Sequence, residues 1–208
     1  MPPILNPAPP WEAHRTEYIL LWHGCTVFDK NNIEAYGIDL TRCRFDTDFG
    51  RGFYTTTVER QARQWAWARF FAWQRANPTL TGNQPVLLRF RVRRFNSARM
   101  ARKLDKGLDG LLSLQFVLGD YTNEDYWSLV QHCRQSTPLT LNHHRRVPGD
   151  WYDVVFGPVS AFWEQRVTMD DADQISFHTT EAIGLMNDLI ESGKKGNSDD
   201  YSWLPVVP

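Results

Sequence analysis

The junction between a glycine-rich turn and a long helical pattern, at residues 48–76, constrains the fold of this chain more than any other feature. Gly50 and Gly52 stand two positions apart in the stretch DFGRGFYTT, and glycine permits positive φ or a close approach to the backbone. A short strand is expected at 53–56, and apolar residues recur at helical spacing over 58–76. The sequence therefore predicts a turn, a strand and a helix in immediate succession.

The helix expected at 58–76 has recognisable ends. Thr56 fits an N-cap with Glu59 as its capping-box partner, and Asn77-Pro78 stops the helix. One face is expected to point inward, formed by Val58, Ala62, Trp65, Ala66, Arg69, Phe70 and Trp73. An inward aromatic face beside the turn indicates either core packing or one wall of a cleft.

The order of the remaining elements indicates the fold class. We expect strands at 17–24, 86–95, 151–156 and 174–177, helices at 123–135 and 181–191, a weaker helix or turn at 107–119, and a loop with one short helix at 25–47. Gly157-Pro158 is expected to close the strand before it. Strands and helices do not alternate regularly. This order argues against a doubly wound parallel sheet and favours an α+β fold with a split antiparallel β-sheet core and flanking helices.

A single domain is expected from the length of the chain. With 208 residues, it can bury one substantial core. The proline-rich residues 1–16 are expected to form a flexible lead-in, 17–193 the domain, and 194–208 a polar, mobile tail.

Charge and cysteine content narrow the function classes. The formal net charge of -1 gives no overall field toward nucleic acid or membrane. Three cysteines without a CxxC pair favour a reducing compartment. No apolar run reaches the ~18 residues that a membrane span needs. The resulting expectation is a cytoplasmic protein.

A row of arginines follows the strand expected at 86–95. Arg89, Arg91 and Arg93 alternate with apolar residues, a pattern typical of a strand with one solvated face. Basic residues continue to Lys106, with a second cluster at His143, His144, Arg145 and Arg146. Such a row either tracks nucleic-acid phosphates or protects an edge strand from pairing, and the second interpretation is favoured.

The pattern itself suggests a small set of ligand-binding candidates. His23 ends a buried strand, where its ring can face a cleft while Gly24 exposes backbone groups. Tyr54 follows the turn and Trp65 lies on the helix, so these two rings can hold a flat ring between them. Core packing is the alternative for each residue, and it is favoured for His23-Gly24 taken alone.

Taken in order, these residues resemble a known pattern. The stretch DFGRGFYT at 48–55, with Gln61-Ala62 and Trp65-Ala66 behind it, resembles the Phe-Gly-x-Gly-x-Tyr segment of poly(ADP-ribose) polymerases and diphtheria-toxin-like ADP-ribosyltransferases. His23-Gly24 resembles the His-Gly pair on the first strand of those enzymes.

The whole pattern resembles even more closely a bacterial family of unknown function placed in the same superfamily. Its members often occur in toxin–antitoxin pairs or as toxin domains. The later blocks YDVVFGP at 152–158 and QISF at 174–177 also resemble that family. The similarity therefore runs in separated pieces from residue 19 to residue 190.

The resemblance implies an ADP-ribosyltransferase-like fold with NAD as co-substrate. The NAD-binding residues that it implies are His23, Gly24, Gly52, Tyr54, Thr55 and Trp65. By this resemblance, His23 bonds the adenosine ribose and the Gly24 backbone holds the nicotinamide amide. Tyr54 stacks on the nicotinamide ring, and Trp65 takes the opposite side.

The implied catalytic set is His23, Tyr54 and Gln174, and its last member departs from the pattern. These transferases usually carry a glutamate where this chain has Gln174, and that glutamate stabilises the developing oxocarbenium charge. Asp173 and Glu181 are alternative sources of a carboxylate. Asp173 is expected to face away from Gln174 because neighbouring side chains of a strand alternate.

Two weaker combinations remain open. Cys25 lies two residues after His23, so the pair can act as a nucleophile and base, although a buried structural thiol is favoured. His143-His144 can ligate a metal, but no Cys, Asp or Glu spacing supports such a site.

The function expected from the sequence is an NAD-dependent mono-ADP-ribosyltransferase, toxin-like, that labels a macromolecular acceptor and releases nicotinamide. The acceptor is a protein or a nucleic acid, and a cognate antitoxin is a further expected partner. The alternatives are a catalytically weak or inactive relative that binds NAD, nucleic acid or a partner protein, and a nucleic-acid-binding protein that relies on the arginine strand.

Overall fold

Two β-sheets organise the described part of the chain, which in this computed structural model comprises residues 17–94, 107–116, 124–135, 151–194 and 199–207. The first sheet is antiparallel and has the order β1 (Tyr18–Thr26), β3 (Pro85–Arg93) and β7 (Tyr201–Pro205). The second has the order β2 (Phe53–Thr55), β6 (Val167–Phe177), β5 (Val154–Phe162) and β4 (Ser113–Gln115).

The α+β class is confirmed, but the second sheet is mixed rather than antiparallel throughout. β4 runs parallel to β5, while β5 and β2 both pair antiparallel to β6. A parallel pair needs a long crossover, and the chain between Gln115 and Val154, which contains α4, supplies it.

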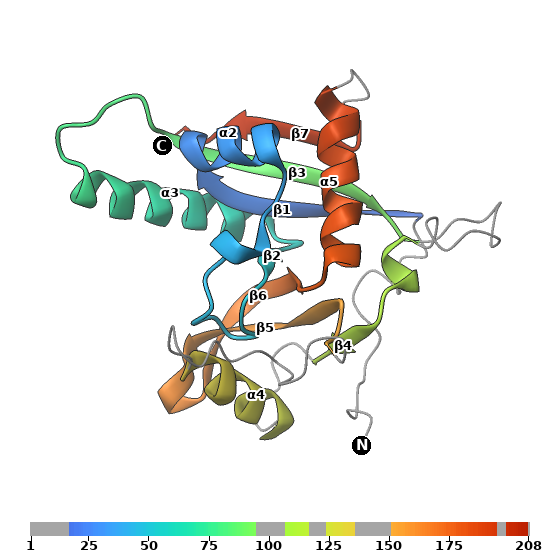
Figure 1. The fold of residues 1–208 in the computed structure, drawn as a ribbon. Helices are drawn as coiled ribbons and strands as arrows, with labels where there is room; N and C mark the ends of the chain where they lie inside the picture. Colours follow the sequence, from blue (N-terminus) through green and yellow to red (C-terminus); the bar gives the residue numbers. More distant parts are fainter. Residues whose placement is uncertain (1–16, 95–106, 117–123, 136–150, 195–198, 208) are drawn as a thin grey trace.

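Four helices flank these sheets in the described residues: α2 (Val27–Tyr36), α3 (Glu59–Ala76), α4 (Glu124–Arg134) and α5 (Thr180–Lys194). Figure 1 shows α3 beside the first sheet and α4 beyond the second sheet. α5 runs along one side of the molecule, from the level of β7 toward that of β2. None of the helices in the described residues combines the length and apolarity that a membrane span needs.

β2 joins the two sheets and creates the split. It pairs with β6, and the next residue, Thr56, exchanges both backbone hydrogen bonds with Trp22 of β1 at 2.8 and 2.9 Å. Beyond this bridge the chain turns into α3, so β1 has no strand partner on this side after Trp22 in the described residues. The open edge of β1 therefore lies beside the turn that the sequence singled out.

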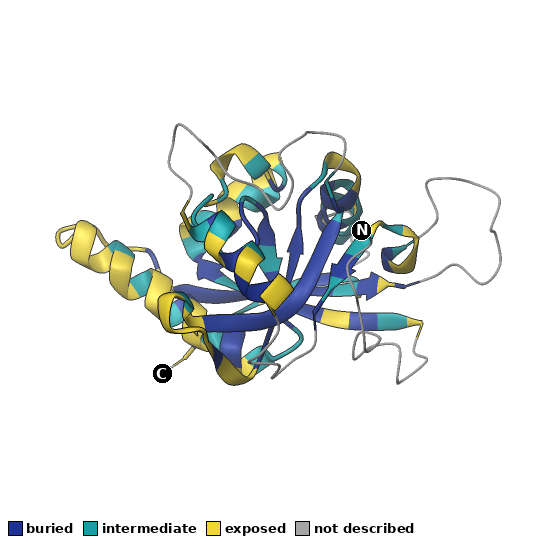
Figure 2. Cartoon of the chain, turned by 90° about the horizontal axis from the view of Figure 1, so that it is seen from below, coloured by how far each residue is buried: buried dark blue, intermediate teal, exposed yellow. Residues whose placement is uncertain are grey.

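The largest apolar core lies between the sheets and under α5. Alternate residues of β1 and β3, including Leu21, Leu88 and Phe90, meet Phe177 of β6 and Met186 of α5 there. Figure 2 shows the strands mainly buried, whereas the outer part of α3 is mainly exposed.

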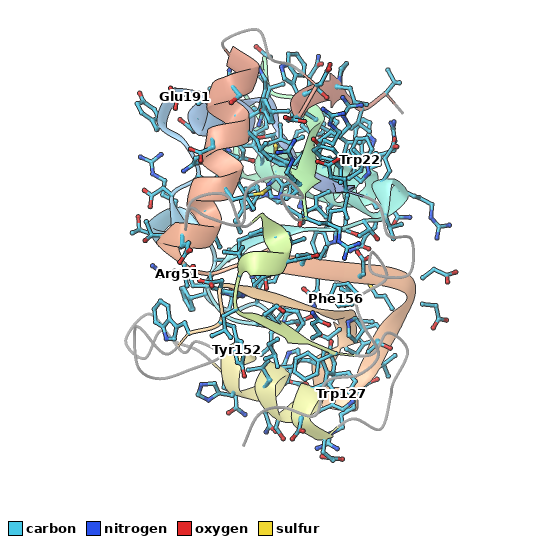
Figure 3. All side chains as sticks on the ribbon, turned by 90° about the vertical axis from the view of Figure 1, so that its right-hand side faces the viewer. Trp22, Arg51, Trp127, Tyr152, Phe156 and Glu191 are labelled. Carbon is cyan, nitrogen blue, oxygen red and sulfur yellow. The ribbon has the colours of Figure 1, made fainter. Side chains whose placement is uncertain are left out.

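A second core packs α4 against the far face of the second sheet. Its members include Phe49, Tyr126 and Trp127. Figure 3 shows Trp127 and Tyr152 beside α4, at the end of the molecule opposite Trp22. Phe49 belongs to this core, so the DFGRG turn is anchored in it.

The alternation of β3 is confirmed, but β3 is not an edge strand. Leu88, Phe90 and Val92 are buried, and β3 lies between β1 and β7. Two arginines on its other face have acidic partners, since Arg91 Nε lies 2.7 Å from Asp200 and Arg93 Nε 3.3 Å from Glu17. The interpretation as a charged edge strand is therefore wrong. Residues 95–106 and the basic cluster at 143–146 lie outside the described residues.

The expectation of a mobile tail is wrong at residues 201–205. This segment forms β7, and its Tyr201 side chain is buried against Phe90, with ring centroids 5.3 Å apart. Its polar neighbours Ser202 and Asp200 mask the strand signal, because the segment is short and Tyr201 is its one buried residue.

The start of α3 differs from the expected capping box. Val58 is the N-cap residue and makes no side-chain cap, while Thr56 Oγ1 bonds Asp173 and Gln61 instead. Asp173 also accepts from the Thr57 backbone N–H at 2.8 Å. The Thr56 N–H that a capping box would give to Glu59 donates to the Trp22 carbonyl, and the distant Asp173 carboxylate holds the residues before α3 instead.

Two strands extend beyond their expected ends, and α2 is better defined than its segment suggested. β5 continues through Gly157-Pro158, with register irregularities beyond Pro158 that accommodate its missing N–H. β6 begins at Val167 rather than near Gln174. α2 begins at a complete capping box between Thr26 and Asp29.

Candidate functional site

A cavity of about 1130 Å³ opens where the two sheets separate. Its walls come from the end of β1, α2 and the chain that follows it, β2, the first turns of α3, β6 and α5. Every expected NAD-binding and catalytic residue lines this one cavity: His23, Gly24, Gly52, Tyr54, Thr55, Trp65 and Gln174. The arginine face of β3 does not border it.

His23 is held at the wall as a neutral imidazole. Its Nδ1–H donates to the backbone carbonyl of Tyr54 at 2.6 Å, because that oxygen can only accept. Burial lowers the pKa of His23 below its ordinary value, so the ring is uncharged at neutral pH. In this tautomer Nε2 is an acceptor, suited to a ligand hydroxyl.

Gly24 presents unpaired backbone groups at the open edge of β1. Trp22 directs its N–H and C=O toward Thr56, and alternation along an antiparallel strand turns those of Gly24 to the same side, away from β3. No described residue bonds to them. A donor and an acceptor thus stand together at the cavity wall.

Packing also requires glycine at position 24, which the sequence did not indicate. A Cβ atom here would overlap the carbonyl oxygen of Ala62 and lie 2.7 Å from the backbone nitrogen of Ala66. Glycine therefore lets α3 pack directly on β1, which brings α3 against the cavity.

Tyr54 is fixed by its hydroxyl rather than by its ring alone. The hydroxyl donates to the Gly50 carbonyl at 2.7 Å and accepts from the Phe49 N–H at 3.1 Å. Burial raises the pKa of this phenol well above its ordinary value, so it stays protonated. The DFGRG turn, with Gly50 at φ 80, therefore holds the Tyr54 ring in place at the cavity.

Gly52 and Thr55 flank Tyr54 but have structural contacts of their own. A Cβ atom at Gly52 would lie 2.8 Å from the buried His178 ring, so the packing of that ring requires glycine here. Thr55 Oγ1 donates to the Ile175 carbonyl at 3.0 Å. Both residues hold β2 against the chain of β6.

Trp65 lies at the cavity but not on the buried face of α3. Ala62 and Ala66 are buried against the sheet, while Trp65 is 50% exposed, since it lies about 100° around the helix from Ala66. The expectation that Trp65 lies on the inward face is wrong. Its ring is not among the described ring contacts of Tyr54, which involve Phe49 and His178.

Gln174 is buried and tied to a carboxylate. Its Nε2 donates to Asp48 Oδ2 at 2.6 Å and to the Pro158 carbonyl at 2.7 Å. Asp48 is also buried, and Arg134 Nη2 lies 2.7 Å from its other oxygen, Oδ1. The sequence did not indicate Asp48 or Arg134, which are 86 positions apart. Their pairing follows from the fold and not from local spacing.

The two alternative carboxylates do not take the place of a glutamate at 174. Asp173 faces away from Gln174, as expected, and its carboxylate bonds Thr56 and Thr57. Glu181 is exposed in the first turn of α5 and is not part of the cavity wall.

Charged side chains at the cavity include two arginines that the sequence did not single out for ligand binding. Arg69 lies 3.5 Å from Asp29, and Arg42 lies 3.6 Å from Asp39. These long, exposed ion pairs hold the guanidinium groups weakly. Both arginines can therefore exchange these partners for an anionic ligand.

The weaker combinations do not form a site in the described residues. Cys25 is buried, and burial raises the pKa of its thiol, so no thiolate is present to act as a nucleophile. No cluster of potential metal ligands occurs among the residues that the structure describes. His143-His144 lies outside them.

Comparison with protein families identifies a family to which the chain is similar. A sequence profile of a family described as a protein of unknown function (DUF3990) matches residues 19–162, which is more than half of the chain. The matched segment contains His23, Tyr54 and Trp65 but ends before Gln174. Searches among curated proteins and solved structures gave no match.

Proposed function

The chain belongs to the DUF3990 family, whose description assigns no activity, and we propose from the cavity that it is an NAD-dependent mono-ADP-ribosyltransferase. The observation that carries the proposal is that His23, Gly24, Tyr54 and Gln174, drawn from three strands of two sheets, line one cavity. The likeness to ADP-ribosyltransferases rests on the sequence pattern and on this convergence.

The nicotinamide amide is proposed to bind at Gly24. A primary carboxamide carries one acceptor and one donor group on the same side, which match the N–H and C=O at an unpaired strand edge. The Tyr54 ring, fixed through its hydroxyl, offers a flat apolar surface for the pyridine ring. Trp65 is then the movable, half-exposed partner on the other side of the ring.

The remainder of NAD is proposed to extend along the cavity wall. His23 Nε2 accepts a hydrogen bond from a hydroxyl of the adenosine ribose. Arg69 and Arg42 lie at the wall with weak acidic partners, and a diphosphate binds guanidinium groups more strongly than an exposed carboxylate does. In this proposal, residues of one cavity bind both the apolar nicotinamide ring and the charged diphosphate of NAD.

The proposed reaction breaks the bond between the nicotinamide nitrogen and C1′ of its ribose. The bonding electron pair leaves with nicotinamide, and positive charge develops on the ribose. A nucleophile of the acceptor then forms a new bond to C1′ and loses its proton to solvent. The acceptor is a protein or a nucleic acid, and a toxin-like role with an antitoxin partner is part of the proposal.

Labelled NAD in cell lysate tests the reaction. We expect the protein to transfer label to macromolecules, and separate protease and nuclease digestions identify the acceptor class by which one releases the label. His23→Ala and Tyr54→Ala are expected to abolish transfer. Trp65→Ala is expected to weaken NAD binding, whereas Trp203→Ala, a matched control at a half-exposed tryptophan outside the cavity, leaves binding unchanged.

The second candidate function is an NAD-binding relative without transferase activity. Gln174 favours it, because an amide has no formal charge to meet the charge that develops on the ribose. Calorimetric binding of NAD without nicotinamide release, in the presence of many acceptors, supports this candidate over the first.

A further inference from the structure

Gln174 presents its amide oxygen, and not its nitrogen, to the cavity. Both hydrogen-bond partners of Nε2, the Asp48 carboxylate and the Pro158 carbonyl, can only accept. The nitrogen must therefore face them, which directs Oε1 away from both. No described residue donates to Oε1, and Gln174 lines the cavity.

Asp48 is held in one orientation behind this amide. Its Oδ2 accepts from the Ser160 N–H at 2.8 Å as well as from Gln174, and its Oδ1 accepts from Ser160 Oγ at 2.8 Å and Arg134 Nε at 2.8 Å. The carboxylate is only 2% exposed, while the Arg134 side chain is 28% exposed. Water therefore screens the cation more than it screens the anion.

We propose that Asp48 is a positioning residue that supplies, through Gln174, the negative charge that the transfer needs. The inference rests on the proposed function. A carboxylate bonded to the N–H side of an amide polarises it and increases the negative charge on its oxygen. The hydrogen bond that Gln174 Oε1 accepts from a hydroxyl of the nicotinamide ribose thus becomes stronger as positive charge develops on that ribose.

This arrangement gives a physical reason for the glutamine. A glutamate at position 174 would place its carboxylate against Asp48 and the Pro158 carbonyl, which both repel it. The residue types at 48 and 174 are therefore coupled: a carboxylate at one position requires an amide at the other.

Steady-state nicotinamide release by four proteins tests the coupling. We expect Asp48→Asn to lower kcat by about tenfold to a hundredfold with KM for NAD nearly unchanged, because the lost interaction strengthens only in the transition state. Gln174→Glu alone is also expected to lower kcat. The double variant D48N/Q174E is expected to exceed Gln174→Glu in activity, since it removes the repulsion between the two carboxylates.

The pH profile of Gln174→Glu gives a readout that a merely structural role does not predict. Two adjacent carboxylates share a proton, so the pKa of the pair rises above the ordinary range. One shared proton restores a donor–acceptor pair between the two side chains, so kcat of this variant is expected to rise as the pH is lowered. The other titratable groups around Asp48 are Arg134, Tyr54, Tyr126 and Cys133, and burial keeps the two tyrosines and the cysteine neutral by raising the pKa of each.

Asp46→Asn is the matched control, because this half-exposed neighbouring carboxylate bonds Arg44 and not Gln174. It is expected to keep the wild-type kcat. If Asp48→Asn does not fold, the acidic rise in the Gln174→Glu profile still decides the question, and its absence overturns the inference. Wild-type kcat in Asp48→Asn, or no recovery in the double variant, overturns the inference and leaves the proposed function standing. A wild-type protein that neither binds nor cleaves NAD overturns both.

Discussion

At the scale of single residues, packing alone requires glycine at two positions of the cavity wall. Gly24 lets α3 approach β1, and Gly52 makes room for the buried His178 ring. The DFGRG segment is thus fixed from behind by β6 and the residues that follow it. The cavity wall is therefore supported by packed core residues behind it.

Gly52→Ala is expected to destabilise the fold by about 1–3 kcal/mol, because overpacking forces buried neighbours to shift. The new Cβ would lie 2.8 Å from the ring of His178, which is hydrogen-bonded to Ser176 and to the Arg51 carbonyl. Chemical denaturation measures the change. Gly184→Ala is the control: it lies within α5 with open space around it, and it is expected to stabilise by about 0.5–1 kcal/mol. Equal effects of the two substitutions would contradict the packing argument.

His23 is expected to make the fold less stable in mild acid. Burial lowers its pKa in the folded state below the ordinary value near 6.5. Between these two values the unfolded chain binds the extra proton, so the free energy of unfolding falls as the pH drops below 6.5 and levels off below the folded pKa. Thermal melting of wild type and His23→Gln from about pH 7.5 to about pH 5 measures this. The melting temperature of wild type should exceed that of His23→Gln by less as the pH is lowered. A difference in melting temperature that does not change with pH would show that the His23 pKa is not lowered.

Residues that the sequence marked by a local signal lie together in the structure, while their binding roles stay predictions. His23, Gly24 and Tyr54 stand beside turn and strand-end signals, and they lie at one cavity. Trp65 was assigned to the wrong face because the apolar stripe of α3 is broad and its buried part consists of small residues, Ala62 and Ala66. Asp48 and Arg134 could not be found, since burial and distant pairing leave no periodic trace.

At the scale of elements, the first sheet depends on its last strand. β7 pairs with the edge of β3 opposite β1, and Tyr201 of β7 extends the core under α5. The sequence did not predict this strand, because five residues of which one is buried give no readable alternation. The longer alternation of β3 was predicted correctly, but its position at the centre of the sheet depends on pairing partners that are distant in sequence.

Tyr201→Ala is expected to cost about 3–5 kcal/mol of stability, as other truncations of large buried aromatic side chains do. Tyr201 is 4% exposed, whereas Trp203, two residues further along the same strand, is 45% exposed. Trp203→Ala is therefore the matched control and is expected to cost about 1 kcal/mol or less, mainly its contact with Lys30. Denaturant titration of both variants checks the contrast, and similar losses would show that β7 does not pack as described.

At the scale of the whole molecule, the cleft exists because two sheets share a bridge between β1 and the end of β2. Trp22 and Thr56 join them, and beyond that point β1 keeps an unpaired edge while α3 begins. The fold class could be predicted from element order, because irregular alternation argues against a doubly wound sheet. The bridge and the mixed second sheet could not, since both depend on contacts between distant segments.

The central claim is that the open edge at Gly24 binds the carboxamide of NAD, and its backbone amide resonance reports this directly. In a protein labelled with ¹⁵N, titration with NAD or with nicotinamide alone is expected to shift the Gly24 amide resonance. ADP-ribose, which lacks the nicotinamide ring but keeps the adenosine ribose proposed to contact the neighbouring His23, is expected to shift it less. A Gly24 resonance that does not respond to saturating NAD, or that responds equally to ADP-ribose, would contradict the account.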